Sequence, residues 1–263
     1  MNFVPKNTNT SHKGIDRHSR IVYNENNKTR RVLMKKILLI GDSIRKGYDQ
    51  YVRERLGEVC EVLFPEDNCQ TSTHILRFFH IWCEGLSTFD FDAVHWNAGA
   101  WDTLRIYGDG TLIPPDVYEN NLVRIIARIR RVCPHAVQIF ATTTPVMECG
   151  YLPDYEMRYN RDIEEYNTIA RRVMEQNGIL VNDLYALMEN TPDTYHSDQT
   201  HYYTAEAIKL LGERVSDVLC DALSLDKERL LCPDASKFAR TEFRNDNECY
   251  IRRGDIFEPV LGN

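Results

Sequence analysis

The sequence has no apolar run long enough to cross a bilayer, and no apolar stretch near its start of the kind that a secretory signal contains. It also lacks a basic surplus, because 32 Lys and Arg stand against 39 Asp and Glu, for a formal net charge of -7. A protein that binds nucleic acid usually carries a basic patch. We therefore expect a cytoplasmic protein whose partners include neither nucleic acid nor a membrane.

Motifs for metals and nucleotide cofactors are missing as well. The chain has 8 cysteines, but no two are spaced C-x-x-C and no nearby histidine completes a zinc-binding pattern. The glycine-containing segment GDSIRKG at 41–47 fits neither the dinucleotide-binding pattern nor the phosphate-binding loop of nucleotide hydrolases. The sequence thus predicts buried thiols, no metal and no organic cofactor.

What is present is an alternation of apolar runs with segments of helical periodicity, beginning near residue 35. The predicted strands are 36–41, 60–66, 91–100, 136–146 and 178–188. The predicted helices are 48–57, 72–86, 116–132, 158–176 and 204–223. Strands that alternate with helices favour a parallel sheet with right-handed crossovers. We expect an α/β fold of the flavodoxin-like type, a three-layer α/β/α arrangement with a five-stranded parallel sheet.

The remaining segments lie outside this alternation. Residues 1–33 are polar and show no period, which predicts a flexible N-terminal arm. Residues 34–223 form the main domain. Residues 224–263 have weak periodicity, so we expect an appendage that packs on the domain or stays partly loose.

A serine stands where the first strand runs into the first helix, after Gly41 and Asp42. Ligands of open α/β sheets bind at the carboxyl ends of the strands, so Ser43 is placed for attack on a substrate. Its hydroxyl needs a base, ideally a histidine oriented by a carboxylate. Asp198 and His201 lie three residues apart before the last helix and are candidates for these roles. The alternative is a serine that only caps the following helix.

Attack on a carbonyl also requires donors for the oxygen that becomes negative. The predicted third strand ends in HWNAGAWD, and alternation of side chains makes Asn97 a candidate donor near its end. The alternative for Asn97 is a residue that ties neighbouring loops together through backbone hydrogen bonds.

The segments GDSI at 41–44, the Asn-containing end of the third strand and D-x-x-H at 198–201 together resemble the SGNH/GDSL hydrolase family over about residues 35–223. The resemblance implies the SGNH hydrolase fold, Ser43 as nucleophile, and Asp198 and His201 as its partners. It also implies an oxyanion hole made by the backbone N–H groups of Ser43 and Cys69, where Cys69 matches a family glycine. Trp101 stands where the family has its oxyanion asparagine, so Asn97 is the expected substitute.

The stretches IGDSIRKGYDQYV and WNAGAWD are most similar to a branch of that family associated with carbohydrate deacetylation. This resemblance implies a serine esterase whose substrate is a small-molecule ester, an O-acetylated sugar or oligosaccharide. Trp101, with Tyr202 and Tyr203, is the expected aromatic wall for the sugar ring. Two alternatives stay open: a lysophospholipase or thioesterase with the same triad, and a non-catalytic carbohydrate-binding protein that retains the fold.

Overall fold

The computed structural model describes residues 19–22, 30–149 and 151–240, and the chain divides into two compact units, Met1–Met34 and Lys35–Asn263. In the first unit, β1 (Ser19–Val22) pairs antiparallel with β2 (Arg30–Leu33). The segment predicted as a flexible arm therefore contains a pair of short strands. The other residues of 1–33 lie outside the described part of the chain.

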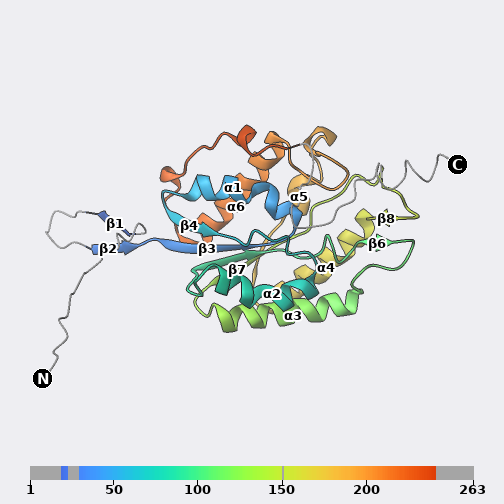
Figure 1. Ribbon diagram of the computed structural model, residues 1–263, viewed down its shortest axis with the longest axis horizontal. Coiled ribbons are helices and arrows are strands. Elements are labelled where there is room, and N and C mark those ends of the chain that lie inside the picture. The colour runs from blue at the N-terminus through green and yellow to red at the C-terminus, as the bar shows by residue number, and fades with distance from the viewer. Residues whose placement is uncertain (1–18, 23–29, 150, 241–263) are drawn as a thin grey trace, which may run out of the picture. The chain divides into compact units, whose positions relative to one another are not determined.

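A parallel sheet forms the centre of the second unit (Figure 1). Its strands are β3 (Lys35–Ile40), β4 (Cys60–Leu63), β5 (Ala93–Trp96), β7 (Val137–Ala141) and β9 (Leu180–Asn182). They follow the order β4-β3-β5-β7-β9, and every neighbouring pair is parallel. This is the predicted flavodoxin-like, five-stranded α/β sheet, which the structure confirms.

Helices cover both faces of the sheet (Figure 1). One face packs against α1 (Ser43–Leu56) and α6 (Ala205–Leu223). The other packs against α2 (Ser72–Gly85), α3 (Pro115–Val132) and α4 (Asn160–Gln176).

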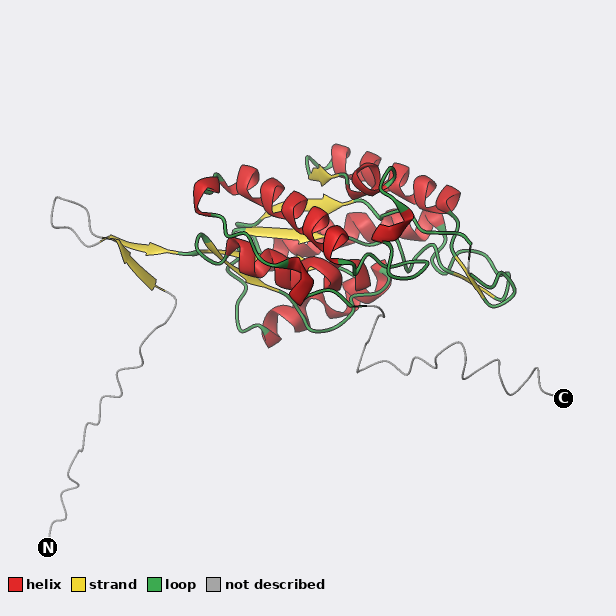
Figure 2. Cartoon of the chain, turned by 90° about the horizontal axis from the view of Figure 1, so that it is seen from above, coloured by secondary structure: helices red, strands yellow, loops and turns green. Residues whose placement is uncertain are grey.

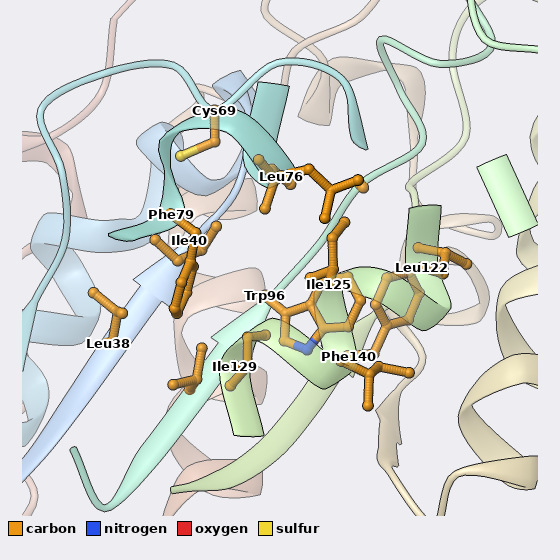
Figure 3. Packing of buried hydrophobic residues seen from close by; sticks show 14 of the residues in the cluster. Leu38, Ile40, Cys69, Leu76, Phe79, Trp96, Leu122, Ile125, Ile129 and Phe140 are labelled. Carbon is orange, nitrogen blue, oxygen red and sulfur yellow. The ribbon is translucent and has the colours of Figure 1, made fainter. Parts of the chain in front are cut away.

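The central strand β3 shows why both faces need cover. Ile37 and Leu39 belong to the core on the α1 and α6 side, whereas Leu38 and Ile40 belong to the core on the α2 and α3 side. Figure 3 shows part of the core on the α2 and α3 side, where Leu38 and Ile40 of β3 lie beside Phe79 and Trp96 extends from the neighbouring strand β5. Because alternate side chains of a strand point to opposite faces, a run of apolar residues is what a strand buried on both faces requires.

The connections carry smaller elements. In the second unit, β6 (Arg105–Ile106) and β8 (Glu156–Met157) pair antiparallel as a two-stranded ribbon, which lies apart from the parallel sheet (Figure 2). A short helix, α5 (Leu184–Met188), follows β9. The described residues also contain three 3₁₀ turns: η1 (Asp193–Tyr195), η2 (Lys227–Arg229) and η3 (Ala235–Lys237).

Several predicted boundaries were wrong: the strands predicted over 60–66, 91–100 and 136–146 end earlier, at Leu63, Trp96 and Ala141, and two further boundaries share one cause. The segment 178–188 is not one strand, because β9 ends at Asn182 and α5 begins two residues later, where the Asp183 carboxylate accepts a hydrogen bond from the Ala186 N–H. The first helix begins at Ser43 rather than at residue 48, because Asp42 caps it. Both cases involve an aspartate that satisfies N–H groups of a first turn, which apolar periodicity does not reveal.

The described part of the C-terminal appendage, residues 224–240, packs on the main domain. The Leu231 N–H donates to the Arg55 carbonyl oxygen at 3.0 Å, and the Arg229 side chain donates to the Glu58 carbonyl oxygen at 2.8 Å. Both acceptors lie at or just beyond the end of α1. Residues 241–263 lie outside the described chain.

Candidate active site

Ser43 is the first residue of α1, at the carboxyl end of β3. The turn before it is tight, because a Cβ atom on Gly41 would lie 1.9 Å from the Asn97 side-chain oxygen. Asp42 caps the helix by accepting a hydrogen bond from the Ile44 N–H at 2.9 Å. A glycine and an aspartate thus fix the backbone on both sides of the serine.

The loop before α6 presents the two other polar residues singled out in the sequence. The Asp198 Oδ1 atom accepts hydrogen bonds from the backbone N–H groups of Thr200 at 2.7 Å and His201 at 2.8 Å. The second carboxylate oxygen lies 2.7 Å from His201 Nδ1. Asp198 therefore shapes its own loop and fixes the orientation of the imidazole.

The other imidazole nitrogen, His201 Nε2, lies 2.9 Å from Ser43 Oγ. With its Nδ1 proton held by Asp198, the neutral ring offers Nε2 as the acceptor of the serine proton. Burial alone raises the pKa of Asp198, but its bonds to His201 and to backbone N–H groups hold that pKa below its ordinary value. The carboxylate thus stays ionised beside a ring that gains charge when it takes a proton.

A second loop, after β7, supports the loop that carries Asp198. The Met147 N–H donates to the Gln199 carbonyl oxygen at 2.9 Å. The hydroxyls of Tyr151 and Thr200 lie 2.6 Å apart. The carboxylate and the histidine are therefore held by contacts to the neighbouring strand end as well as by their own turn.

Asn97 directly follows β5, with its amide Nδ2 at 3.0 Å from Asp42 Oδ2. The structure thus brings Asn97 next to the turn that carries Ser43. One of its two amide hydrogens is donated to Asp42, and this bond links the carboxyl ends of β3 and β5. The second amide hydrogen is not used in that bond.

Cys69 lies in the loop before α2, and its backbone N–H donates to the Gly41 carbonyl oxygen at 3.1 Å. This N–H is therefore already paired, contrary to the expectation that it faces a substrate. Its side chain lies in the apolar core (Figure 3), and burial raises the pKa of the thiol to about 11. A thiol with that pKa is protonated at neutral pH and is not a nucleophile.

The three aromatic residues expected to line the site differ in exposure. Trp101 is partly exposed. Tyr202 is only 1% exposed, packs in the core below α1 and α6, and donates its hydroxyl proton to the Pro145 carbonyl oxygen at 3.0 Å. Tyr203 is 0% exposed. The prediction that Tyr202 and Tyr203 line a sugar site was therefore wrong, because both side chains are covered by protein.

Arg158 is a residue near this site that the sequence reasoning missed. It is buried, donates from Nε to the Ala100 carbonyl oxygen at 2.6 Å, and pairs with Glu156 at 3.2 Å. Its guanidinium carbon lies 6.0 Å from the centre of the Trp101 ring. An arginine in the segment before a helix is common at protein surfaces, so its sequence position gave no signal.

The positive charge of Arg158 acts on the pKa of Asp42, in the turn that precedes Ser43. Burial raises the pKa of Asp42 above its ordinary value, and a hydrogen bond from the Ile44 N–H and the charges of Arg158 and His201 oppose that rise. The site therefore combines a buried carboxyl group with cationic character nearby.

Two kinds of feature are absent from the described residues. No group of three or more His, Cys, Asp or Glu side chains within 30–149 and 151–240 is arranged to hold a metal ion. Over the same part of the chain, no helix combines the length and the apolar character that a membrane span needs.

Comparisons with known proteins place the fold. Residues 39–205 match the model of the GDSL-like Lipase/Acylhydrolase family. No curated protein matches the sequence.

Several solved structures share the fold. A lipase/acylhydrolase from Enterococcus faecalis is 24% identical, with a TM-score of 0.55 over 75% of this chain and 98% of the other. An acetyl xylan esterase is 16% identical, with a TM-score of 0.54 over 70% and 99%. An acetylxylan esterase from Geobacillus stearothermophilus, solved as a catalytic mutant, is 15% identical, with a TM-score of 0.53 over 73% and 95%. With its family match spanning most of the main domain, this chain belongs to the GDSL-like lipase/acylhydrolase family.

Proposed function

We propose that the protein is a serine esterase that hydrolyses O-acetyl esters through a covalent acyl-enzyme. The observation that carries this proposal is the chain of two hydrogen bonds, 2.9 Å from Ser43 Oγ to His201 Nε2 and 2.7 Å from His201 Nδ1 to Asp198 Oδ2. The same three groups, in these roles, perform acyl transfer on several unrelated folds.

In the first half-reaction, Ser43 Oγ attacks the ester carbonyl carbon while His201 Nε2 takes the hydroxyl proton. The tetrahedral intermediate then collapses, the bond to the alcohol oxygen breaks, and Nε2 gives its proton to the departing alcohol. In the second half-reaction, a water attacks the acetyl-serine and Nε2 takes the water proton. Collapse releases acetate and returns a proton to Ser43 Oγ. Asp198 stabilises the charged imidazolium in both halves.

The oxyanion needs donors, and the backbone N–H of Ser43 is the first of them. As the first residue of α1, Ser43 has an N–H that no helical carbonyl accepts, and the helix N-terminus favours negative charge. We assign the second donor to the remaining amide hydrogen of Asn97. The bond from the Cys69 N–H to Gly41 supports a structural role for that amide in place of the expected donor role.

For the alcohol part of the ester, the proposal favours a carbohydrate. Trp101 offers a partly exposed indole, a flat apolar surface of the kind that stacks on a sugar ring. Arg158 keeps a positive charge behind that ring. Two of the similar structures are described as acetyl xylan esterases, which supports O-acetylated oligosaccharides as the first substrates to try.

The test is acetate release from p-nitrophenyl acetate and from acetylated xylo-oligosaccharides. The intact chain is compared with Ser43→Ala and with Ser87→Ala, a matched control at an exposed serine. The proposal expects turnover of both substrates, a loss on the order of 10³-fold or more in Ser43→Ala, and no change in Ser87→Ala. Equal turnover rates in Ser43→Ala and in the intact chain would rule out the serine mechanism.

Further substrates and a binding measurement distinguish this proposal from the alternatives. A series of p-nitrophenyl esters from acetate to decanoate, with an acyl thioester beside it, tests the acyl group. A rate that rises with chain length, or that is highest on the thioester, would replace the acetylesterase by a lysophospholipase or thioesterase. Sugar binding in calorimetry without turnover of any ester would identify a non-catalytic carbohydrate-binding protein.

A further inference from the structure

One buried side chain contacts two of the three residues that form the hydrogen-bond chain in the candidate active site. Tyr203 donates its hydroxyl proton to the Ser43 carbonyl oxygen at 2.7 Å. Its ring also stacks on the His201 imidazole, with 4.9 Å between ring centres and 18° between planes. Tyr203 is fully buried, so it reaches no substrate. A single residue thus links the backbone of the nucleophile to the ring of the base.

The ring of Tyr203 sits directly against α1. A Cβ atom on Gly47 would lie 2.9 Å from two ring carbons of Tyr203, so only glycine allows this approach without a shift. Since Ser43 lies one turn earlier on the same helix, the position of the tyrosine ring and the position of the serine are coupled.

Arg240, in the C-terminal appendage, completes the arrangement. Its guanidinium carbon lies 4.2 Å from the centre of the Tyr203 ring, a distance at which the cation and the ring attract each other. The Arg240 backbone N–H donates to the Tyr203 carbonyl oxygen at 3.0 Å. Its Nη2 donates to the Lys46 carbonyl oxygen, also at 3.0 Å. Arg240 therefore joins the first turn of α1 to the residue two positions after His201.

The segment before Arg240 is anchored on the same two helices. Ala235 packs in a small core with Tyr51 of α1 and Ile208 of α6. Phe238 meets the Tyr51 ring edge to face, with 6.2 Å between centres. These contacts position Arg240 beside Tyr203, although most of the appendage has little apolar periodicity.

We propose that Arg240 and Tyr203 are positioning residues for catalysis, and that residues 232–240 are a required part of the active site without touching the substrate. The inference rests on the proposed serine mechanism. Ser43 and His201 come from elements 158 residues apart in the chain. A misplacement of about 1 Å between reacting groups costs on the order of 10²-fold in rate. Tyr203 and Arg240 hold the two elements in register.

The test measures kcat and KM for p-nitrophenyl acetate in Arg240→Ala, Arg240→Lys and Tyr203→Phe. Arg240→Ala should lower kcat by about tenfold to 10²-fold with KM changed less than about twofold, because ground-state binding is untouched. Arg240→Lys keeps a cation over the ring and should recover most of that loss. Tyr203→Phe keeps the stacking of the ring on His201 but loses the hydrogen bond to the Ser43 carbonyl oxygen. Its kcat should lie between those of Arg240→Ala and Arg240→Lys.

Arg229→Ala is the matched control, because it removes an arginine bond to a backbone carbonyl from the same appendage, at Glu58 and away from the site. Its kcat should equal that of the intact chain. Thermal unfolding of each variant separates a local effect from unfolding. An unchanged kcat in Arg240→Ala, or an equal loss in Arg229→Ala, would overturn the positioning role.

A second measurement does not depend on the identity of the ester. The rate at which a fluorophosphonate labels Ser43, followed by mass spectrometry, reports the reactivity of the serine alone. Slower labelling in Arg240→Ala than in Arg229→Ala supports the inference even where no ester is turned over, and equal labelling overturns it. Failure of the intact chain on every ester would instead count against the proposed function.

Discussion

Replacing Asp102 by asparagine should change how the stability of the protein depends on pH. Asp102 is fully buried, and its carboxylate oxygens accept hydrogen bonds from the Ser72 N–H at 3.0 and 3.1 Å and from the Ser72 hydroxyl. Burial raises the pKa of Asp102 to about 7, against the lowering effect of those bonds. Near pH 6 the folded protein therefore holds a proton on Asp102 that the unfolded chain has released.

The sign follows from this proton. The folded pKa lies above the unfolded value of 3.8, so the stabilising contribution is complete below about pH 4 and is lost as pH rises to about 7. One pKa unit corresponds to about 1.4 kcal/mol, so a difference of about 3 makes the loss about 4 kcal/mol. Asparagine does not titrate. The free energy of unfolding of Asp102→Asn minus that of the intact chain should therefore grow by about 4 kcal/mol between pH 4 and pH 7.5.

Urea unfolding followed by circular dichroism at four pH values measures this difference. Taking a difference is necessary because buried His95 acts in the opposite sense: burial lowers its pKa to about 4, so its contribution is lost as pH falls from about 6.5 to 4. His95 titrates alike in both proteins and cancels. A difference that stays constant with pH would refute the reasoning, since it would mean that the Ser72 bonds keep Asp102 ionised.

Three further changes test other parts of the structure. Asp198→Asn should lower kcat on the order of 10³- to 10⁴-fold in a protein that still folds, because the amide no longer fixes the imidazole tautomer; steady-state kinetics and thermal unfolding check this. Gly41→Ala should reduce soluble expression or unfold at lower urea, because its Cβ would lie 1.9 Å from the Asn97 oxygen. Ile129→Ala should reduce the free energy of unfolding by about 2 to 5 kcal/mol, since Ile129 is fully buried in the core below α3; an effect under 1 kcal/mol would contradict that packing.

Periodicity along the chain was enough to predict the sheet and its layers. Each strand is an apolar run bounded by turn residues, and parallel topology limits where such runs can go. The boundaries failed where an aspartate caps a helix, as at Asp42 and Asp183. Caps are single side-chain interactions, so a pattern averaged over a window does not detect them.

The sequence also indicated Ser43, Asp198 and His201, because two short motifs at the two ends of the fold point to one place. It did not indicate the hydrogen-bond state of the Cys69 N–H or the burial of Tyr202. Both depend on how distant segments meet, which local spacing does not encode. Arg158 was missed for the same reason, because only the return of the chain beside Trp101 brings it to the site.

The carboxylate of Asp42 uses both of its oxygens, one for the first turn of α1 and one for Asn97 at the end of β5. Ser43, the proposed nucleophile, thereby follows a residue that links the carboxyl ends of β3 and β5. Substitutions next to Ser43 therefore affect both folding and the proposed chemistry, so few of them should be tolerated. Under the proposed function, Trp101 is the better place to alter specificity, because it is partly exposed and lies outside the sheet. A library aimed at new esters should therefore start at that position.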